Sequence, residues 1–282
     1  MHLGVVMTGN GAHAAAAAGV MQELEARGIE PCAVCGMQGG AAVAVMHLSG
    51  LGAREMLEAA GAASALGGKV MPAWPMAARR LAKPGSALLR SGRIERLLLE
   101  YGGRRLMPLC PRTGVILCRH LRTGHHVVFS SRSYEQERDT MLCMQVTAGF
   151  AARAAMAMPP FFSPLSWLGS CLLPESDVAF ACRQMFLMGA QRVLVIAPEL
   201  SARSEPDVLD LAGGMLLHTM TPDARIAVLH VPMPDAVGAL SIHKMPACAE
   251  AGRAAAEREL DRLFSGMGMA FCRVLPFNRK NG

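Results

Sequence analysis

The fold of this chain is decided by residues 3–48, LGVVMTGNGAHAAAAAGVMQELEARGIEPCAVCGMQGGAAVAVMHL. An apolar run at 3–7 ends in a Gly-rich turn, and residues 14–26 have the composition of a helix that closes at Arg27-Gly28. The same order then repeats, with a short strand at 32–35, a tight turn at 36–40 and a helix at 41–48. Short buried strands that alternate with helices predict an α/β fold whose mostly parallel sheet is covered on both faces.

The remaining sequence continues this pattern and gives no signal for a domain boundary or an internal repeat. We therefore expect a single domain over residues 1–282, with a frayed tail at 278–282. The expected later elements are a strand pair at 115–118 and 126–130 around the turn residues 122–124, a helix at 141–156 stopped by Pro159-Pro160, strands at 192–197 and 226–231, and a last helix at 249–264.

Composition indicates a soluble protein of a reducing compartment. No run of 18 or more strongly apolar residues is present, and the first seven residues lack the features of a signal peptide. The nine cysteines lie mostly in apolar stretches, where free thiols behave as small apolar side chains. Cys32 and Cys35 form a CxxC without a second pair, so we interpret both as core residues. We expect a cytoplasmic protein without metal or cofactor.

Positive charge is concentrated between residues 79 and 105 of a chain whose net charge is +6. An apolar stripe at helical spacing accompanies these residues, so the simplest interpretation is a solvated helix face. Peripheral contact with an anionic membrane is the alternative, and it would use Arg79, Arg80, Lys83, Arg104 and Arg105. Few aromatic residues alternate with the basic ones, which argues against nucleic acid.

The turn at 36–40 has the frame of a nucleophile elbow. In a G-x-S-x-G elbow, small residues let the chain turn sharply from strand to helix and hold the central side chain exposed. Here Gly36, Gly39 and Gly40 supply the small residues, but the central residue is Gln38. A primary amide is not a nucleophile, and a neighbouring base cannot activate it as it activates a hydroxyl.

These first fifty residues resemble the start of a patatin-like phospholipase. The family's Gly-Gly-Gly-x-Arg-Gly loop is written here Gly9-Asn10-Gly11-Ala12-His13-Ala14. The segment HLRTGHHVVFSS at 120–131 is similar to a family strand pair, and AAMAMPPFFSP at 154–164 is similar to the passage before the family's catalytic aspartate. The resemblance covers most of residues 1–200 and implies a three-layer α/β/α sandwich.

The same resemblance implies that catalysis has been lost. The aspartate expected in an Asp-Gly turn falls at about Pro174, and the sequence contains no Asp-Gly pair. Because a serine-aspartate dyad needs both partners, we expect a pseudoenzyme that binds a fatty acid, a phospholipid or another anionic ligand. The loop residues Gly9, Asn10 and Gly11 would supply amides to an anion, and His13 would add a pH-sensitive charge.

Two other interpretations remain open at this point. An active lipid hydrolase with a shifted site would use Asp177 as the carboxylate and Cys35 or Ser170 as the nucleophile. A dinucleotide-binding protein is the weaker alternative, because the third glycine of its loop would fall at Ala14. His125 and His126 are adjacent on a strand or turn, so we expect a solvated pair and no metal site.

Overall fold

One sheet forms the centre of the molecule. The computed structural model describes residues 2–70, 92–159, 161–201, 206–207, 209–210 and 223–268. Seven of the described strands follow the order β5-β4-β3-β2-β1-β8-β9, while β7 pairs with both β3 and β6. The bounds are β1 Leu3–Met7, β2 Ala33–Gly36, β3 Gly114–His120, β4 His126–Ser130, β5 Thr140–Cys143, β6 Leu165–Trp167, β7 Ser170–Pro174, β8 Arg192–Glu199 and β9 Ile226–Pro232. The pairs β1–β2, β1–β8, β2–β3, β8–β9 and β4–β5 are parallel, so the sheet is mostly parallel as predicted.

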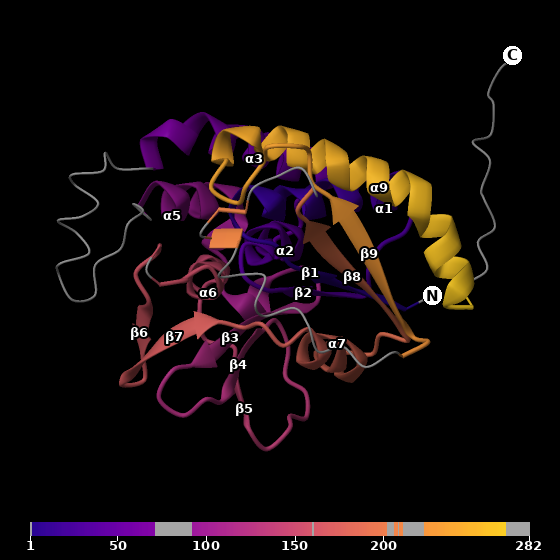
Figure 1. Cartoon of the computed structure of the whole chain (residues 1–282). Helices are drawn as coiled ribbons and strands as arrows, with labels where there is room; N and C mark the ends of the chain where they lie inside the picture. The colour runs from indigo at the N-terminus through magenta and orange to yellow at the C-terminus, as the bar shows by residue number, and fades with distance from the viewer. Residues whose placement is uncertain are drawn as a thin grey trace, which may run out of the picture.

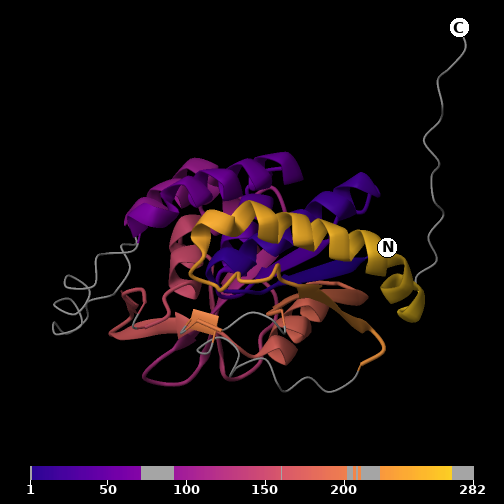
Figure 2. The same cartoon turned by 45° about the horizontal axis from the view of Figure 1, so that its top comes forward.

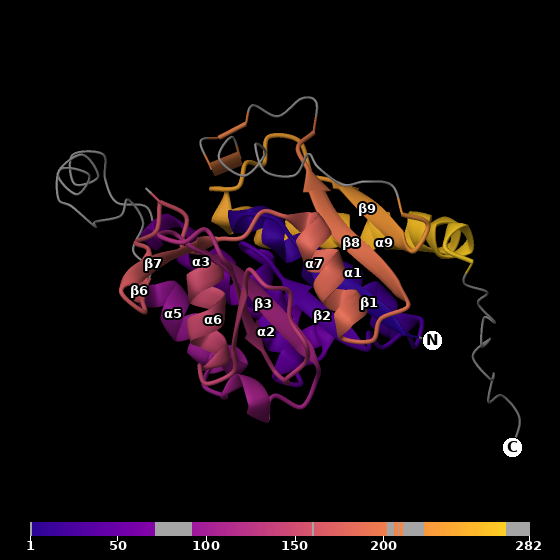
Figure 3. The same cartoon turned by 90° about the horizontal axis from the view of Figure 1, so that it is seen from below.

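Helices cover both faces of this sheet (Figures 1 and 2). Seen from below, α7 crosses the face that the other helices leave open (Figure 3). The helices are α1 Ala16–Ala26, α2 Gly40–Leu48, α3 Ala53–Val70, α5 Gly92–Leu98, α6 Ala148–Ala155, α7 Val178–Leu187 and α9 Met245–Gly266, with short helical turns η1 Gly11–Ala15, η2 Leu99–Gly103, η3 Met107–Leu109 and η4 Ile242–Lys244. The described part of the chain is therefore a three-layer α/β/α sandwich.

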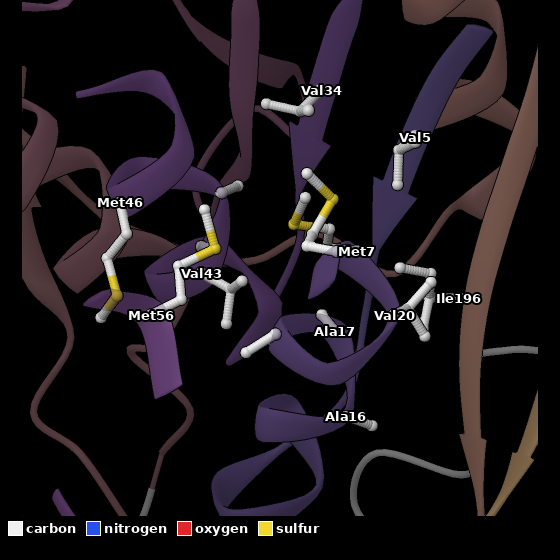
Figure 4. Close-up of a cluster of buried hydrophobic side chains, with 14 of the residues drawn as sticks. Val5, Met7, Ala16, Ala17, Val20, Val34, Val43, Met46, Met56 and Ile196 are labelled. Atoms are coloured by element: carbon white, nitrogen blue, oxygen red, sulfur yellow. The ribbon is translucent and has the colours of Figure 1, made fainter. Parts of the chain in front are cut away.

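The larger core lies between the sheet and the helices of the crowded face. Val5, Met7 and Ile196 point from β1 and β8 toward Val20 of α1, while Met46 and Met56 fill the space between α2 and α3 (Figure 4). These residues are at most 6% exposed. Successive side chains of β1 point to opposite faces of the sheet. Val6, between Val5 and Met7, therefore packs in a second core beneath α7.

Close approach of two helices fixes this layer. A Cβ on Gly19 of α1 would overlap the backbone of Ala249, and one on Gly252 of α9 would overlap the backbone of Ala16. The two glycines thus allow the backbones of α1 and α9, which lie side by side in Figure 1, to come into contact. The first strands and helices are thereby held against the last helix of the described chain.

The sequence predicted most of these elements, and one prediction was wrong. The hairpin of β3 and β4 and the strands β8 and β9 are confirmed. The helix expected at 141–156 is instead a strand at 140–143 followed by a helix that begins at Ala148. Thr147 explains the break, because its hydroxyl accepts a hydrogen bond from the Phe150 amide and caps α6. The expected tail at 278–282 lies outside the described residues.

Among the described helices, none combines the length and the apolar character needed to span a bilayer.

Candidate functional site

The turn between β2 and α2 has the backbone of a nucleophile elbow. Gln38 has a φ of 52°, in the left-handed region that residues other than glycine rarely adopt. Its side chain is 3% exposed. A Cβ on Gly39 would lie 2.7 Å from the Gly9 carbonyl oxygen, and a Cβ on Gly40 would overlap the Met7 carbonyl oxygen. The glycines around Gln38 are thus required by neighbouring backbone, and the turn presents an amide where an elbow normally presents a hydroxyl.

The loop after β1 lies against this elbow. Gly9 and Gly11 have φ values of 102° and 49°, and the Gly11 nitrogen lies 3.3 Å from the point that a Cβ on Gly39 would occupy. The Ala12 amide donates a 2.7 Å hydrogen bond to the Ala239 carbonyl. Within the part of the chain that the structure describes, the amides of Asn10 and Gly11 donate to no backbone carbonyl. Two donors beside the elbow are thus available to an oxyanion or a carboxylate.

His13 has a different position from the one expected. Its ring is 5% exposed, its Nε2 donates to the Val237 carbonyl at 3.0 Å, and its Nδ1 lies 3.3 Å from Asp210 Oδ1. Asp210 in turn accepts from the Ala239 amide at 3.2 Å. The imidazole therefore fastens the loop to segments that follow β8 and β9. The prediction that His13 adds a pH-sensitive charge for an anion is corrected in one respect, because both ring nitrogens already face Val237 and Asp210.

Pro174, the position at which the sequence predicts that the catalytic aspartate is missing, is the last residue of β7 and lies near the elbow. Gly36, the last residue of β2, is paired with Ile116 of β3. Pro174, the last residue of β7, is paired with Cys118 on the same edge of β3. Two residues of strand separate these positions, which is roughly 7 Å. The chain of β7 thus runs toward the elbow from the opposite direction and stops beside it. The residue at that point is Pro174, which has no side chain that could act as a base.

The next residue, Glu175, is buried and fully engaged. Its side chain is 0% exposed, Oε2 accepts from His126 Nδ1 at 2.6 Å, and Oε1 accepts from Arg119 at 3.1 Å. The backbone amides of Ser176 and Asp177 also donate to Oε1. Burial alone would raise the pKa of this carboxyl. The hydrogen bonds from His126 and the two amides, together with the Arg119 charge, instead hold the pKa of Glu175 below its usual value.

The sequence did not reveal this cluster, and the prediction that His126 is solvated was wrong. The His126 ring stacks on Phe180 with 3.7 Å between ring centroids, so it is not half of a solvated pair with His125. The only signal in the sequence was a charged residue directly after the apolar run of β7. Its partners come from β3 and β4, and their contact with Glu175 depends on strand register.

The residues proposed for a shifted catalytic site are occupied elsewhere. Asp177 caps α7, because its Oδ1 accepts from the Phe180 amide at 2.8 Å. Burial raises the pKa of the Cys35 thiol well above its usual value, which disfavours the reactive thiolate. Ser170 lies at the far end of β7 from the elbow, and its Oγ accepts from the Arg122 amide. Gln38 is therefore not compensated by any of these three residues.

An apolar cavity opens beside the elbow. It contains about 960 Å³ of space between atoms, including the part open to solvent. Asn10, Gly11 and Gly39 stand at its elbow end, so the free loop amides and the apolar walls belong to one site. Its walls are the apolar side chains of α1, α2, α3 and α5 together with residues 156–162, notably Ala14, Ala18, Val43, Met46, Met56, Ala59, Ala60, Ala63, Leu66, Ile94, Leu97, Leu98, Met156, Met158 and Phe162.

Metal ligation has no support in the described residues, since no three His, Cys, Asp or Glu side chains among them are arranged to hold an ion. Cys32 and Cys35 are free thiols, and Cys35 lies in the core beneath α7. Of the basic residues considered for membrane contact, Arg104 and Arg105 are exposed. Arg79, Arg80 and Lys83 lie outside the described residues.

Known proteins resemble this chain in structure only. No protein-family model matches the sequence, and no curated protein matches it. VipD from Legionella pneumophila aligns with a TM-score of 0.53 at 12% sequence identity, over 93% of this chain and 67% of VipD. The chain has the α/β fold of the patatin-like phospholipases.

Two further structures align with TM-scores below 0.5. ExoU of the Pseudomonas aeruginosa type III secretion system, in its complex with SpcU, gives 0.46 at 16% identity, over 94% of this chain and 52% of ExoU. Human GIVD cytosolic phospholipase A2, in complex with methyl gamma-linolenyl fluorophosphonate, gives 0.35 at 13% identity, over 95% and 59%. The chain thus spans between about half and two thirds of the proteins it matches.

Proposed function

We propose that this chain binds an acyl chain or a similar apolar ligand without hydrolysing it. The observation that carries the proposal is an apolar cavity that adjoins an elbow whose central side chain is Gln38. Acyl transfer on such an elbow needs a hydroxyl or thiol nucleophile and a base within hydrogen-bond reach. Gln38 offers no such nucleophile, and Pro174, at the position expected for the acidic partner, offers no such base.

The binding half of the proposal rests on the chemistry of the cavity. Its walls are formed mainly by alanine, methionine, leucine and isoleucine side chains, which favour an apolar ligand over a polar one. Methionine side chains such as Met46 and Met56 adapt their shape to flexible ligands. At the elbow end, the amides of Asn10 and Gly11 could bind a carboxylate or a phosphate oxygen. A fatty acid or a lysophospholipid has this combination of tail and head.

The alternative of an active lipid hydrolase is weakened by the same geometry. Pro174 occupies the position expected for the acidic partner, and Glu175 is held by His126 and Arg119. A carboxylate that accepts four hydrogen bonds is poorly suited to act as a general base. We therefore expect no turnover of p-nitrophenyl butyrate above the rate in buffer.

Filling the cavity is expected to abolish ligand binding. In Ala63→Phe the new ring would project from α3 into the cavity and compete with an apolar tail. We expect the affinity for cis-parinaric acid, measured by its fluorescence, to fall at least tenfold. Ala65→Phe adds the same ring at an exposed position of α3 that does not line the cavity, and it should bind as the unmodified chain does. Equal binding by both variants would refute the cavity as the site.

A further inference from the structure

Two hairpin tips lie side by side at one edge of the sheet. The connection between β3 and β4 contains Leu121, whose amide donates to the Cys171 carbonyl at 2.9 Å. The neighbouring residue Arg122 donates its amide to Ser170 Oγ at 3.2 Å. Both acceptors belong to β7, which forms the second hairpin with β6. The tips are therefore joined into one surface, seen at the lower left of the molecule in Figure 1.

The tip of the second hairpin is strained in an unusual way. Trp167 is paired with Ser170, so Leu168 and Gly169 form a two-residue connection, with φ values of 47° and 76°. A hairpin turn with positive φ at both positions strongly prefers Asn-Gly or Asp-Gly, because a bulky side chain is strained there. Leu168 is nevertheless present and is 68% exposed. The turn itself gains nothing from a leucine at this position.

The other side chains of the surface give it a consistent chemical character. Leu121 is 57% exposed. The Trp167 ring is half-buried and rigidly held, edge-to-face against His120 and Phe129. Arg122 is exposed. Residues 119–126 and 163–174 contain Arg119, Arg122 and four histidine or aromatic side chains but no aspartate or glutamate.

The surface projects beyond the elbow. Gly36, where the elbow begins, is level with Ile116 of β3, and Leu121 is five residues further along. Five strand residues correspond to roughly 16 Å. The elbow edge of the sheet therefore carries a protruding pair of leucines with a tryptophan behind them and an arginine beside them.

We propose that these tips, Leu121, Arg122, Trp167 and Leu168, dock on the surface of an anionic lipid bilayer. Exposed leucines can enter the boundary between headgroups and acyl chains, and tryptophan is favoured at that depth. Arg122 matches the negative charge of phosphatidylglycerol or phosphatidylserine. The proposal goes beyond ligand binding in the cavity and uses a different surface from the basic residues 104 and 105. Those residues precede the opposite end of β3.

The test is sedimentation of the full chain with phosphatidylcholine vesicles that contain about 30 mol % phosphatidylglycerol. Leu168→Asn creates the preferred Asn-Gly turn, so the melting temperature should stay equal or rise, while the vesicle-bound fraction should fall at least fivefold. Leu109→Asn is the matched control, because Leu109 is 67% exposed and lies before the other end of β3. It should bind vesicles as the unmodified chain does.

Three results would overturn the proposal: no sedimentation of the unmodified chain with these vesicles, unchanged binding by Leu168→Asn, or equal losses in Leu168→Asn and Leu109→Asn. Binding that is as strong to pure phosphatidylcholine would also contradict it, because Arg122 would then contribute nothing. Binding of cis-parinaric acid is measured in solution without vesicles, so failure of this proposal is distinguishable from failure of the cavity as an acyl site.

Discussion

Glu175→Gln is expected to lower the free energy of unfolding by about 3 kcal/mol, because the change leaves His126 and Arg119 facing an amide in place of a buried carboxylate. The amide also places two donors among four existing ones, so part of the hydrogen bonding is lost as well. Urea unfolding of both proteins at neutral pH measures the difference.

The pH dependence of this loss has a defined direction. The pKa of Glu175 in the folded chain lies below its usual value of 4.5, so the stabilising contribution is fully present above that value. It is lost as the pH falls through the folded-state pKa, and the gap between the two proteins should narrow there. Glu30→Gln removes a carboxylate that is 74% exposed and should cost at most about 0.5 kcal/mol. A loss in Glu175→Gln no greater than in this control would contradict the structural role given to the cluster.

Gly40→Ala is expected to be the second severe change, with a loss of about 3 kcal/mol or more. A Cβ at this position would overlap the Met7 carbonyl oxygen and lie 2.9 Å from the Thr8 nitrogen, and these are backbone atoms of the strand and loop beside the elbow. Relief of the overlap requires α2 to move away from β1, which would also widen the elbow end of the cavity. Thermal unfolding together with cis-parinaric acid binding should show both losses.

The control for this change is Gly61→Ala on α3. Nothing lies within 4 Å of a Cβ at Gly61, which is exposed. Alanine is favoured over glycine inside a helix, so this variant should be more stable by about 0.5–1 kcal/mol. If Gly40→Ala were tolerated as well as Gly61→Ala, the close contact between the elbow and β1 would be wrong.

The sequence predicted the elements whose signals are local. The glycines at 36, 39 and 40 defined the elbow, and the structure places Gln38 at its centre with the positive φ that such a turn imposes. The β-branched run at 192–197 likewise became β8. In these cases a short stretch of chain carries the whole preference, and no distant contact is needed to decide it.

The features that the sequence did not reveal depend on distant contacts. Residues 141–143 were expected to begin a helix, but pairing with β4 makes residues 140–143 a strand. The direction of His13 depends on Val237 and Asp210, which are about two hundred residues away. Glu175 meets His126 and Arg119 only because β7 and β4 flank β3 in a particular register.

The most direct test of acyl binding without hydrolysis is equilibrium dialysis of the chain against radiolabelled oleoyl lysophosphatidylcholine, followed by extraction and chromatography of the bound label. We expect about one equivalent of label per chain, recovered as intact lysophospholipid and strongly reduced in Ala63→Phe. Recovery of the label as free oleic acid, or no retention by the unmodified chain, would contradict this account.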